Sequence, residues 1–242
     1  MAGIYRNLWY KTCKYGLSWL PDTLFHNAVG LIMYKRFHVP FHWMNTKQPK
    51  TFSEKLNWLK IHPVVPNEAE LADKYDVRDF IKRTIGEQYL VPILGVWDNA
   101  DDIDFDKLPN QFVLKLTKGS GYNLICNNKS KLDIRKTRKM LRDWLKVNCY
   151  YFSREPQYKG KSKLVAEEML EYNITDYKFF CFNGEPKYVE LYIDRFGDHK
   201  KLFCDMDWNV AGFTTANDVA KVTVEQPKEF AEMKEVAKKL CN

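Results

Sequence analysis

FVLKLTKGSGYN, residues 112–123, predicts a short buried strand that carries one lysine and ends in a glycine loop. The period-two alternation of its first five residues puts the phenylalanine and both leucines on one face of the strand and Lys115 on the other. An ammonium group among apolar neighbours is costly unless an anion meets it. The stretch therefore predicts an anion site with phosphate as the natural ligand; the alternative is a lysine that reaches solvent from an edge strand.

The loop after the strand offers the donors that a phosphate needs. Gly119 and Gly121 flank Ser120, which leaves backbone amides accessible, and Lys118 adds a positive charge beside them. The sequence has no GxxxxGK[ST] motif, and GSG is too short for the dinucleotide motif GxGxxG. A protein kinase would carry its glycine loop before the strand lysine, and its HRD and DFG motifs are absent. What remains is a strand lysine followed by a loop of small residues.

The composition is that of a globular protein without a membrane span. Of 242 residues, 45% are hydrophobic and 29% are charged, which argues against a disordered chain. The six cysteines contain no CxxC pair, so we expect reduced thiols rather than a zinc site or a disulfide framework. No run is long and apolar enough for a signal peptide or a spanning helix. These features predict a cytoplasmic protein.

Residues 1–50 concentrate the positive charge and many of the aromatic side chains. They hold seven lysines and arginines against Asp22 alone, a net charge of +6 out of +7 for the whole chain, and ten of its 36 aromatic residues. Basic and aromatic residues together are typical of a segment that meets an anionic membrane or polymer. The alternative is a pair of helices packed on the core with solvated lysines outside. We expect peripheral contact with the inner face of an anionic membrane, and no nucleic-acid partner.

Periodicity and capping signals predict an alternation of helices and strands. Asp22 is expected to cap a helix that runs to about Phe37, and Thr51 with Glu54 has the pattern of a capping box. The other expected helices are residues 3–20, 51–61, a stretch through 71–81 that stops at Gly86, 134–147, and a last helix opened by Pro227. The expected strands are residues 90–97, 112–116, 123–127, 163–170 and 200–205.

Asn183-Gly184 predicts a tight β-hairpin between residues 177–182 and 186–194. A two-residue loop would pair Phe182 with Glu185, Phe180 with Lys187 and Lys178 with Val189. Lys178 would then be a second unpaired ammonium group on an apolar sheet face. Two such lysines from separate sheets could converge on one polyanion, so we expect a nucleotide between two β-layers.

With these residues in hand, the chain resembles the ATP-grasp superfamily, and within it the teichuronopeptide-biosynthesis (TupA-like) branch associated with bacterial surface polysaccharides. The segments that carry the resemblance are TFSEKLNWLK (51–60), ADKYDVRDFI (72–81), LVPILGVWD (90–98), LPNQFVLKLTKGSG (108–121), KLVAEEML (163–170), DYKFFCFNGEPKYV (176–189) and the helix from Pro227. The resemblance implies an α+β fold with the nucleotide between two α+β subdomains. We expect a basic aromatic helical segment at 1–50, a helical region at 51–106 and the ATP-grasp domain at 107–242.

The resemblance also implies roles for individual residues. Lys115 would contact the α and β phosphates, and Lys118, Gly119, Ser120 and Gly121 would form a phosphate flap. Glu167, Glu168, Met169 and Leu170 would form the hinge that meets the adenine, Asp176 would reach the ribose, and Lys178 with Arg195 would complete a catalytic phosphate clamp. The structural alternatives are an exposed strand end for the two glutamates, a turn former for Asp176 and a surface base for Arg195.

The chemistry that the resemblance implies is carboxylate activation: ATP phosphorylates a carboxylate, and an amine or similar nucleophile displaces the phosphate. Cofactors would be ATP and Mg2+, and the acceptor a polysaccharide or a uronic-acid-containing precursor. The family's metal ligands lie on strands expected beyond residue 242, so the metal ligands are unassigned and poor turnover is expected; Asp194, Asp205 and Asp207 remain as candidates. Two alternatives stay open: a nucleotide-binding accessory protein without activity, and a glycosyltransferase that uses Asp205-Met-Asp207 as a metal motif.

Overall fold

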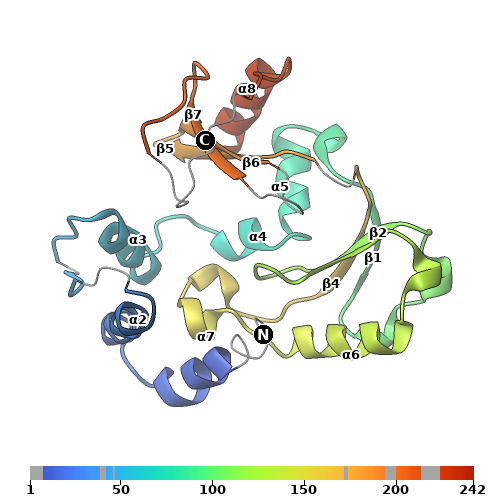
Figure 1. The fold of residues 1–242 in the computed structure, drawn as a ribbon, viewed down its shortest axis with the longest axis horizontal. Coiled ribbons are helices and arrows are strands. Elements are labelled where there is room, and N and C mark those ends of the chain that lie inside the picture. The colour runs from blue at the N-terminus through green and yellow to red at the C-terminus, as the bar shows by residue number, and fades with distance from the viewer. Residues whose placement is uncertain (1–7, 39–41, 46, 172–173, 194–199, 214–223) are drawn as a thin grey trace. The chain divides into compact units, whose positions relative to one another are not determined.

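The computed structural model describes residues 8–38, 42–45, 47–171, 174–193, 200–213 and 224–242 (Figure 1). The chain divides into two compact units, the first made of Met1–Val77 and Pro92–Glu168 and the second of Arg78–Val91 and Met169–Asn242. Helices and antiparallel sheets occur together, which confirms the expected α+β class. No helix in these ranges is long and apolar enough to cross a membrane.

The first unit contains a four-stranded sheet of order β1-β4-β2-β3 in which every neighbouring pair is antiparallel. Its strands are β1 (Ile93–Trp97), β2 (Phe112–Leu116), β3 (Asn123–Cys126) and β4 (Leu164–Glu168). β2 follows its predicted bounds, whereas β4 is shorter than the predicted strand at 163–170. β4 lies between β1 and β2, so residues far apart in the sequence meet at the centre of the sheet.

One face of this sheet forms the core of the first unit. The phenylalanine and leucines of β2 pack there with Leu164 and Ala166 of β4 and with Leu141 and Trp144 of α6 (Ile134–Leu145). α6 lies along this side of the sheet in Figure 1. The helix predicted at 134–147 is present but ends at Leu145, and its Leu141 and Trp144 are buried.

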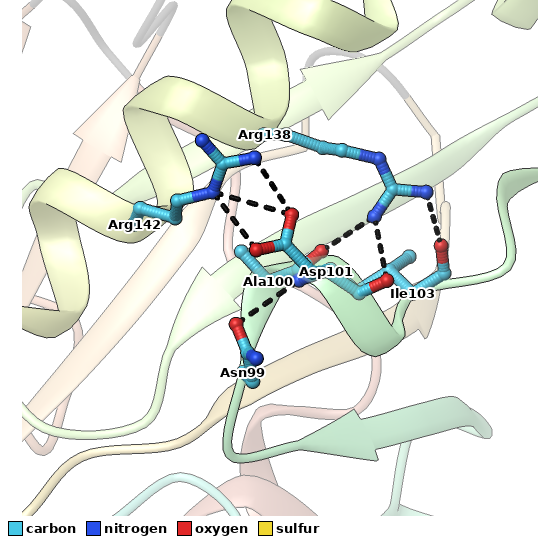
Figure 2. A network of polar contacts seen from close by, with 6 residues as sticks. All are labelled: Asn99, Ala100, Asp101, Ile103, Arg138 and Arg142. Atoms are coloured by element: carbon cyan, nitrogen blue, oxygen red, sulfur yellow. Dashed lines mark hydrogen bonds and ion pairs between the residues drawn. The ribbon is translucent and has the colours of Figure 1, made fainter.

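Two arginines of α6 fix the helix to the turn after β1 (Figure 2). Arg138 donates to the carbonyls of Ala100, Asp101 and Ile103 at 2.7, 3.0 and 2.8 Å, around the 3₁₀ turn η3 (Ala100–Asp102). Arg142 makes a fork-like contact with the carboxylate of Asp101, with the closest atoms 2.7 Å apart. The contacts of Arg138 supply hydrogen-bond donors to turn carbonyls that are not paired within a helix or a strand.

The N-terminal helices pack on α7 (Tyr150–Ser153) through Arg154. Arg154 donates to the carbonyls of Leu17, Ser18 and Leu20, just after η1 (Thr12–Leu17), and forms an ion pair of 3.2 Å with Asp22. Asp22 is the first residue of α2 (Asp22–Phe37) and makes no capping hydrogen bond, so its predicted role as a cap is wrong. The carboxylate serves the arginine instead.

The helices of residues 51–86 follow their capping signals but are interrupted once. Thr51 and Glu54 form the predicted capping box of α3 (Phe52–Ile61). The predicted stretch through 71–81 divides into α4 (Glu68–Ala72) and α5 (Val77–Thr84). Asp73 separates them, because its side chain accepts from the amides of two following residues at 2.9 and 3.2 Å and forms a turn.

The second unit contains a three-stranded antiparallel sheet of order β5-β6-β7 with α8 packed on it. The sheet and this helix are β5 (Asp176–Phe182), β6 (Glu185–Ile193), β7 (Lys200–Asp205) and α8 (Phe230–Cys241), and residues 78–91, with most of α5 and with η2 (Glu87–Tyr89), belong to the same unit. Phe230 of α8 is buried against Val189 and Leu191 of β6. The remaining short 3₁₀ segments of the chain are η4 (Phe105–Lys107), η5 (Lys129–Lys131) and η6 (Pro156–Tyr158).

The predicted hairpin is present, but its register differs from the prediction. Phe182 pairs with Glu185 as expected, and the register then shifts between Phe180 and Cys181. Phe180 consequently pairs with Tyr188 and Lys178 with Glu190, not with Lys187 and Val189. Because side chains alternate between the two faces of a sheet, a register shift of one residue changes which side chains of the neighbouring strand lie on the same face. Lys178 therefore does not share the apolar face of β6 that packs on α8.

Candidate functional site

Lys115 lies on the sheet face opposite the core of the first unit, as the alternation predicts. Its diagonal neighbour across β2 and β4 is Glu167, and the two side chains form an ion pair. The side chain of Lys115 is 30% exposed and that of Glu167 only 9%. Lys115 is thus a partly open cation beside a nearly buried carboxylate, which corrects the expectation of an unpaired charge on an apolar face.

The glycine loop after β2 has the backbone shape that only glycine adopts easily. Gly119 and Gly121 have φ of +117° and +77°. A Cβ atom on Gly119 would also lie 2.9 Å from Sγ of Cys149, too close for any other residue. Ser120 and Gly121 are exposed at the tip, while the ammonium group of Lys118 donates to the carbonyl of Lys159 at 3.1 Å.

Lys74, in the turn between α4 and α5, holds the glycine loop through hydrogen bonds to its carbonyls. Its ammonium group donates to the carbonyls of Leu116, Thr117 and Gly119 at 3.1, 3.2 and 2.9 Å. Its backbone amide also donates to the carbonyl of Thr117 at 3.0 Å. Burial lowers the pKa of Lys74, and the nearby charge of Lys115 lowers that pKa further. The three carbonyls compensate for much of the desolvation of this cation.

The carbonyls held by Lys74 determine where two amides of the loop point. In a trans peptide the C=O and N–H groups lie on opposite sides of the C–N bond. Because the carbonyls of Thr117 and Gly119 face Lys74, the amides of Lys118 and Ser120 face away from it. In the described part of the chain neither amide donates to a backbone carbonyl. The loop therefore turns two amide donors away from Lys74, and amides that are not used within the backbone can bind a phosphate.

The four residues of the expected hinge lie at the end of β4. Glu168 ends the strand with an exposed side chain, and its amide donates to the carbonyl of Pro92 at 3.0 Å. The division of the chain into two units falls between Glu168 and Met169. Met169 is half-buried and Leu170 is exposed. The expected contact of these residues with an adenine stays a prediction.

Lys178 is part of a charged cluster on the second unit's sheet. Its ammonium group lies 3.5 Å from the carboxylate of Asp176 and 3.5 Å from the ring centroid of Tyr192. On the same face Lys201 donates to the hydroxyl of Tyr192 at 3.0 Å and lies 3.4 Å from the buried carboxylate of Glu190. The hydrogen bond that Lys201 donates to Tyr192, followed by the charge of Glu190, raises the pKa of Lys201. Lys178 is paired, contrary to the prediction that it stands alone.

Of the three aspartates considered for a metal site, Asp205 and Asp207 lie within the described residues and Asp194 does not. Asp205 accepts from the amides of Asp207 and Asn209 at 2.9 and 2.8 Å, so its carboxylate holds its own turn together. These hydrogen bonds, together with the one from the Asn209 side chain, lower its pKa. Asp194 and Arg195 lie outside the described residues. Within the described ranges no three histidine, cysteine, aspartate or glutamate side chains form a group that could hold a metal ion.

The sequence indicated Lys115, the loop and Lys178 as candidates, but it did not indicate the side chains that hold them. Lys74 contacts a loop more than forty residues away, and nothing in its local sequence identifies that partner. Glu190 and Lys201 join the cluster around Lys178 only because the hairpin register shifts. The alternation of β6 and β7 would have indicated them, had that shift been foreseen.

The fold and these sites define an α+β protein of the ATP-grasp superfamily. The model of the TupA-like ATPgrasp family matches residues 54–242, which is more than three quarters of the chain, and the chain belongs to this family. The resemblance inferred from the sequence is thereby confirmed. Comparison with curated proteins finds no significant match.

Proposed function

We propose that this protein is an ATP-dependent ligase that activates a carboxylate and joins it to an amine or a similar nucleophile. Membership of the TupA-like ATP-grasp family supports this activity. The observation that carries the proposal is the position of Lys115 beside a loop whose Lys118 and Ser120 amides point away from Lys74. A strand lysine and backbone amides of a glycine loop are groups that bind the phosphates of a nucleotide.

The described residues fit a nucleotide in two respects. Lys115 is open enough to exchange part of its contact with Glu167 for a phosphate oxygen, because a third of its side chain is exposed. The cluster of Lys178 with Asp176 offers a second cation beside a carboxylate that can accept from ribose hydroxyls. We propose that Lys178 contacts the phosphates of the same nucleotide as Lys115, with Asp176 at the ribose. Glu167 and the segment Glu168–Leu170 would meet the adenine.

In the proposed reaction a carboxylate oxygen of the acceptor attacks the γ-phosphorus of ATP, and the bond from that phosphorus to the β–γ bridging oxygen breaks. An acyl phosphate and ADP result. The amine then attacks the acyl carbon, phosphate leaves, and an amide forms with loss of one proton. Lys115, Lys178 and the loop amides neutralise and position the phosphates during the first step. The described residues hold no acidic cluster that fits magnesium, so no step is assigned to a metal.

The acceptor that we propose is a bacterial surface polysaccharide or a precursor that contains a uronic acid. The carboxylate of a uronic acid is the group that such a ligase would activate. We also propose that the protein works in the cytoplasm at the inner face of the membrane, where such precursors are assembled. The support is the family and the basic aromatic segment of residues 1–50.

The test is ADP release in single-turnover reactions with ATP, magnesium, glucuronate or galacturonate, and a panel of amines. We expect ADP release that depends on the uronic acid, and an amide product, detected by mass spectrometry, that also requires the amine. Lys115→Met/Glu167→Gln should abolish both signals. ATP binding without ADP release for any acceptor would leave a nucleotide-binding protein and would contradict the ligase. Absence of ATP binding would contradict the nucleotide site itself.

A further inference from the structure

A basic hollow of about 750 Å³ lies between η1 and α6 in the first unit, away from Lys115 and the glycine loop. Five lysines line it: Lys11 and Lys14 from the N-terminal helix, and Lys136, Lys139 and Lys146 from α6 and its end. The hydroxyl of Tyr10 donates to the carbonyl of Lys146 at 3.2 Å and joins the two walls. The hollow thus combines part of residues 1–50 with α6, a helix that lies more than a hundred residues away in the sequence.

The charges in this hollow do not balance. Asp143 serves both Lys139 and Lys146, at 3.1 and 3.0 Å. Lys136 pairs with Asp133 at 3.3 Å. The described ion pairs leave the two lysines of the N-terminal helix without a carboxylate; the ammonium group of Lys14 instead lies 5.2–5.6 Å from the ring centroids of three tyrosines. Five lysines against two aspartates attract an anion.

The rim of the hollow continues into an apolar stripe that faces solvent. Leu8, Tyr15 and Trp19 are 60%, 72% and 76% exposed. Leu8 lies in the short helical stretch before η1, Tyr15 in η1 itself and Trp19 in the turn after it, while Tyr10 and Cys13 of the same segment are buried. Tyr15 also lines the hollow, so the lysines and the apolar stripe belong to one surface.

We propose that this η1–α6 surface docks on an anionic phospholipid membrane, with lipid phosphates at the lysines and the stripe in the interface. Exposed leucine, tyrosine and tryptophan beside lysines fit a bilayer surface, where apolar side chains enter and cations meet headgroups. The basic side chains are all lysines, which act as point charges, whereas recognition of nucleic acid favours the planar fork of arginine. The proposal goes beyond the nucleotide chemistry and does not depend on it.

Co-sedimentation of the full chain with vesicles tests the proposal. We expect binding to vesicles of phosphatidylcholine with about one third phosphatidylglycerol, little binding to pure phosphatidylcholine, and loss of binding as salt rises. Lys11→Gln/Lys136→Gln should weaken binding to the anionic vesicles about tenfold or more. Trp19→Ser should weaken it several-fold without changing its dependence on salt.

The matched control is Lys228→Gln/Lys239→Gln, which removes two exposed lysines of the second unit and should leave vesicle binding unchanged. Equal loss in the control and in the Lys11/Lys136 variant would overturn the assignment to this surface. Equal binding to neutral and anionic vesicles would overturn the headgroup contact. Binding to a soluble acidic polysaccharide but not to vesicles would identify a glycan site instead. ATP affinity, measured on the same variants, should not change, so failure here is distinguishable from failure of the proposed ligase.

Discussion

At the scale of single residues, Lys115 carries the clearest prediction. Replacing it by methionine removes a charge-assisted contact to phosphate, so ATP affinity should fall at least ~tenfold. The substitution alone would leave Glu167 as a nearly buried carboxylate without its cation, which destabilises the fold. The informative variant is therefore Lys115→Met/Glu167→Gln, measured by calorimetry beside Glu167→Gln. Equal ATP affinity of these two proteins, both folded by circular dichroism, would contradict a role for Lys115.

The contacts of Lys74 lead to a prediction about the conformation of the loop, as distinct from the charge that meets the phosphate. Lys74→Met removes the donor to three carbonyls, so the loop should lose its fixed shape and ATP affinity should fall about tenfold or more. Hydrogen exchange should quicken across residues 117–122 even without ATP. Lys163→Met, which removes a nearby cation that does not touch these carbonyls, is the control. Unchanged exchange in the Lys74 variant would show that the loop holds its shape without this lysine.

His26 predicts how stability depends on pH. Burial, with a smaller effect of Lys60, lowers its pKa to about 4, and its Nε2 atom has no partner among the described residues. The unfolded chain takes up this proton near pH 6.5, well before the folded chain does. Acidification from about pH 6.5 to about pH 4 should therefore cost on the order of 1–3 kcal/mol of unfolding free energy. Urea unfolding of His26→Gln should have a flatter pH profile; an identical profile would exclude this histidine.

Residue roles were predictable where they depended on local pattern and not where they depended on contacts across the fold. The alternation of β2 placed Lys115 on the correct face, and the glycines around Ser120 have the expected positive φ. The partner of Lys115 was missed because Glu167 lies 52 residues away and becomes its diagonal neighbour only when β4 pairs with β2. The alternation of a strand can indicate that a charged side chain is buried. Its partner can be identified only when it is known which strands are neighbours in the sheet.

At the scale of elements, the contacts in Figure 2 predict which arginine holds α6 in place. Arg138→Met removes three hydrogen bonds from a cation to turn carbonyls and should destabilise the protein by ~2 kcal/mol. Arg142→Met removes an ion pair with Asp101 in which both side chains are about half exposed and screened by solvent, so it should destabilise the protein less than Arg138→Met does. Urea unfolding of the two variants measures the difference. A larger loss for the Arg142 variant would reverse the assignment.

Turn and cap chemistry made some elements predictable and left others open. The capping box of α3 and the Asn183-Gly184 hairpin are both present, because each is specified by a few adjacent residues. The register of β5 and β6 is not local, because one shift near Cys181 changes every pair beyond it. Asp22 resembles a cap in sequence, but the buried guanidinium of Arg154 competes for its carboxylate.

At the scale of the whole molecule, the order of the sequence segments that resemble the family was more informative about the fold than any one segment, because each segment alone is a weak signal. The α+β class and the family follow from that order, and the family match over residues 54–242 confirms it. The sheet order of the first unit did not follow, because β1 and β4 are neighbours in space although residues 98–163 separate them in the sequence. The division between Glu168 and Met169 likewise depends on tertiary contacts that no motif records.

The proposal that Lys115 and Lys178 contact one nucleotide predicts a response in both units at once. A ligand that binds the folded state protects the groups it contacts and stabilises that state by mass action. Addition of ATP should therefore slow hydrogen exchange in the loop of residues 117–122 and also in β5 around Lys178. Lys178→Met should weaken ATP binding about tenfold and reduce the protection in both segments, because each reports the same bound nucleotide. Lys187→Met, an exposed lysine on the neighbouring strand, should change neither. Protection of the loop with unaltered exchange around Lys178 would restrict the nucleotide site to the first unit and would assign the cluster of Lys178, Glu190 and Lys201 to another ligand.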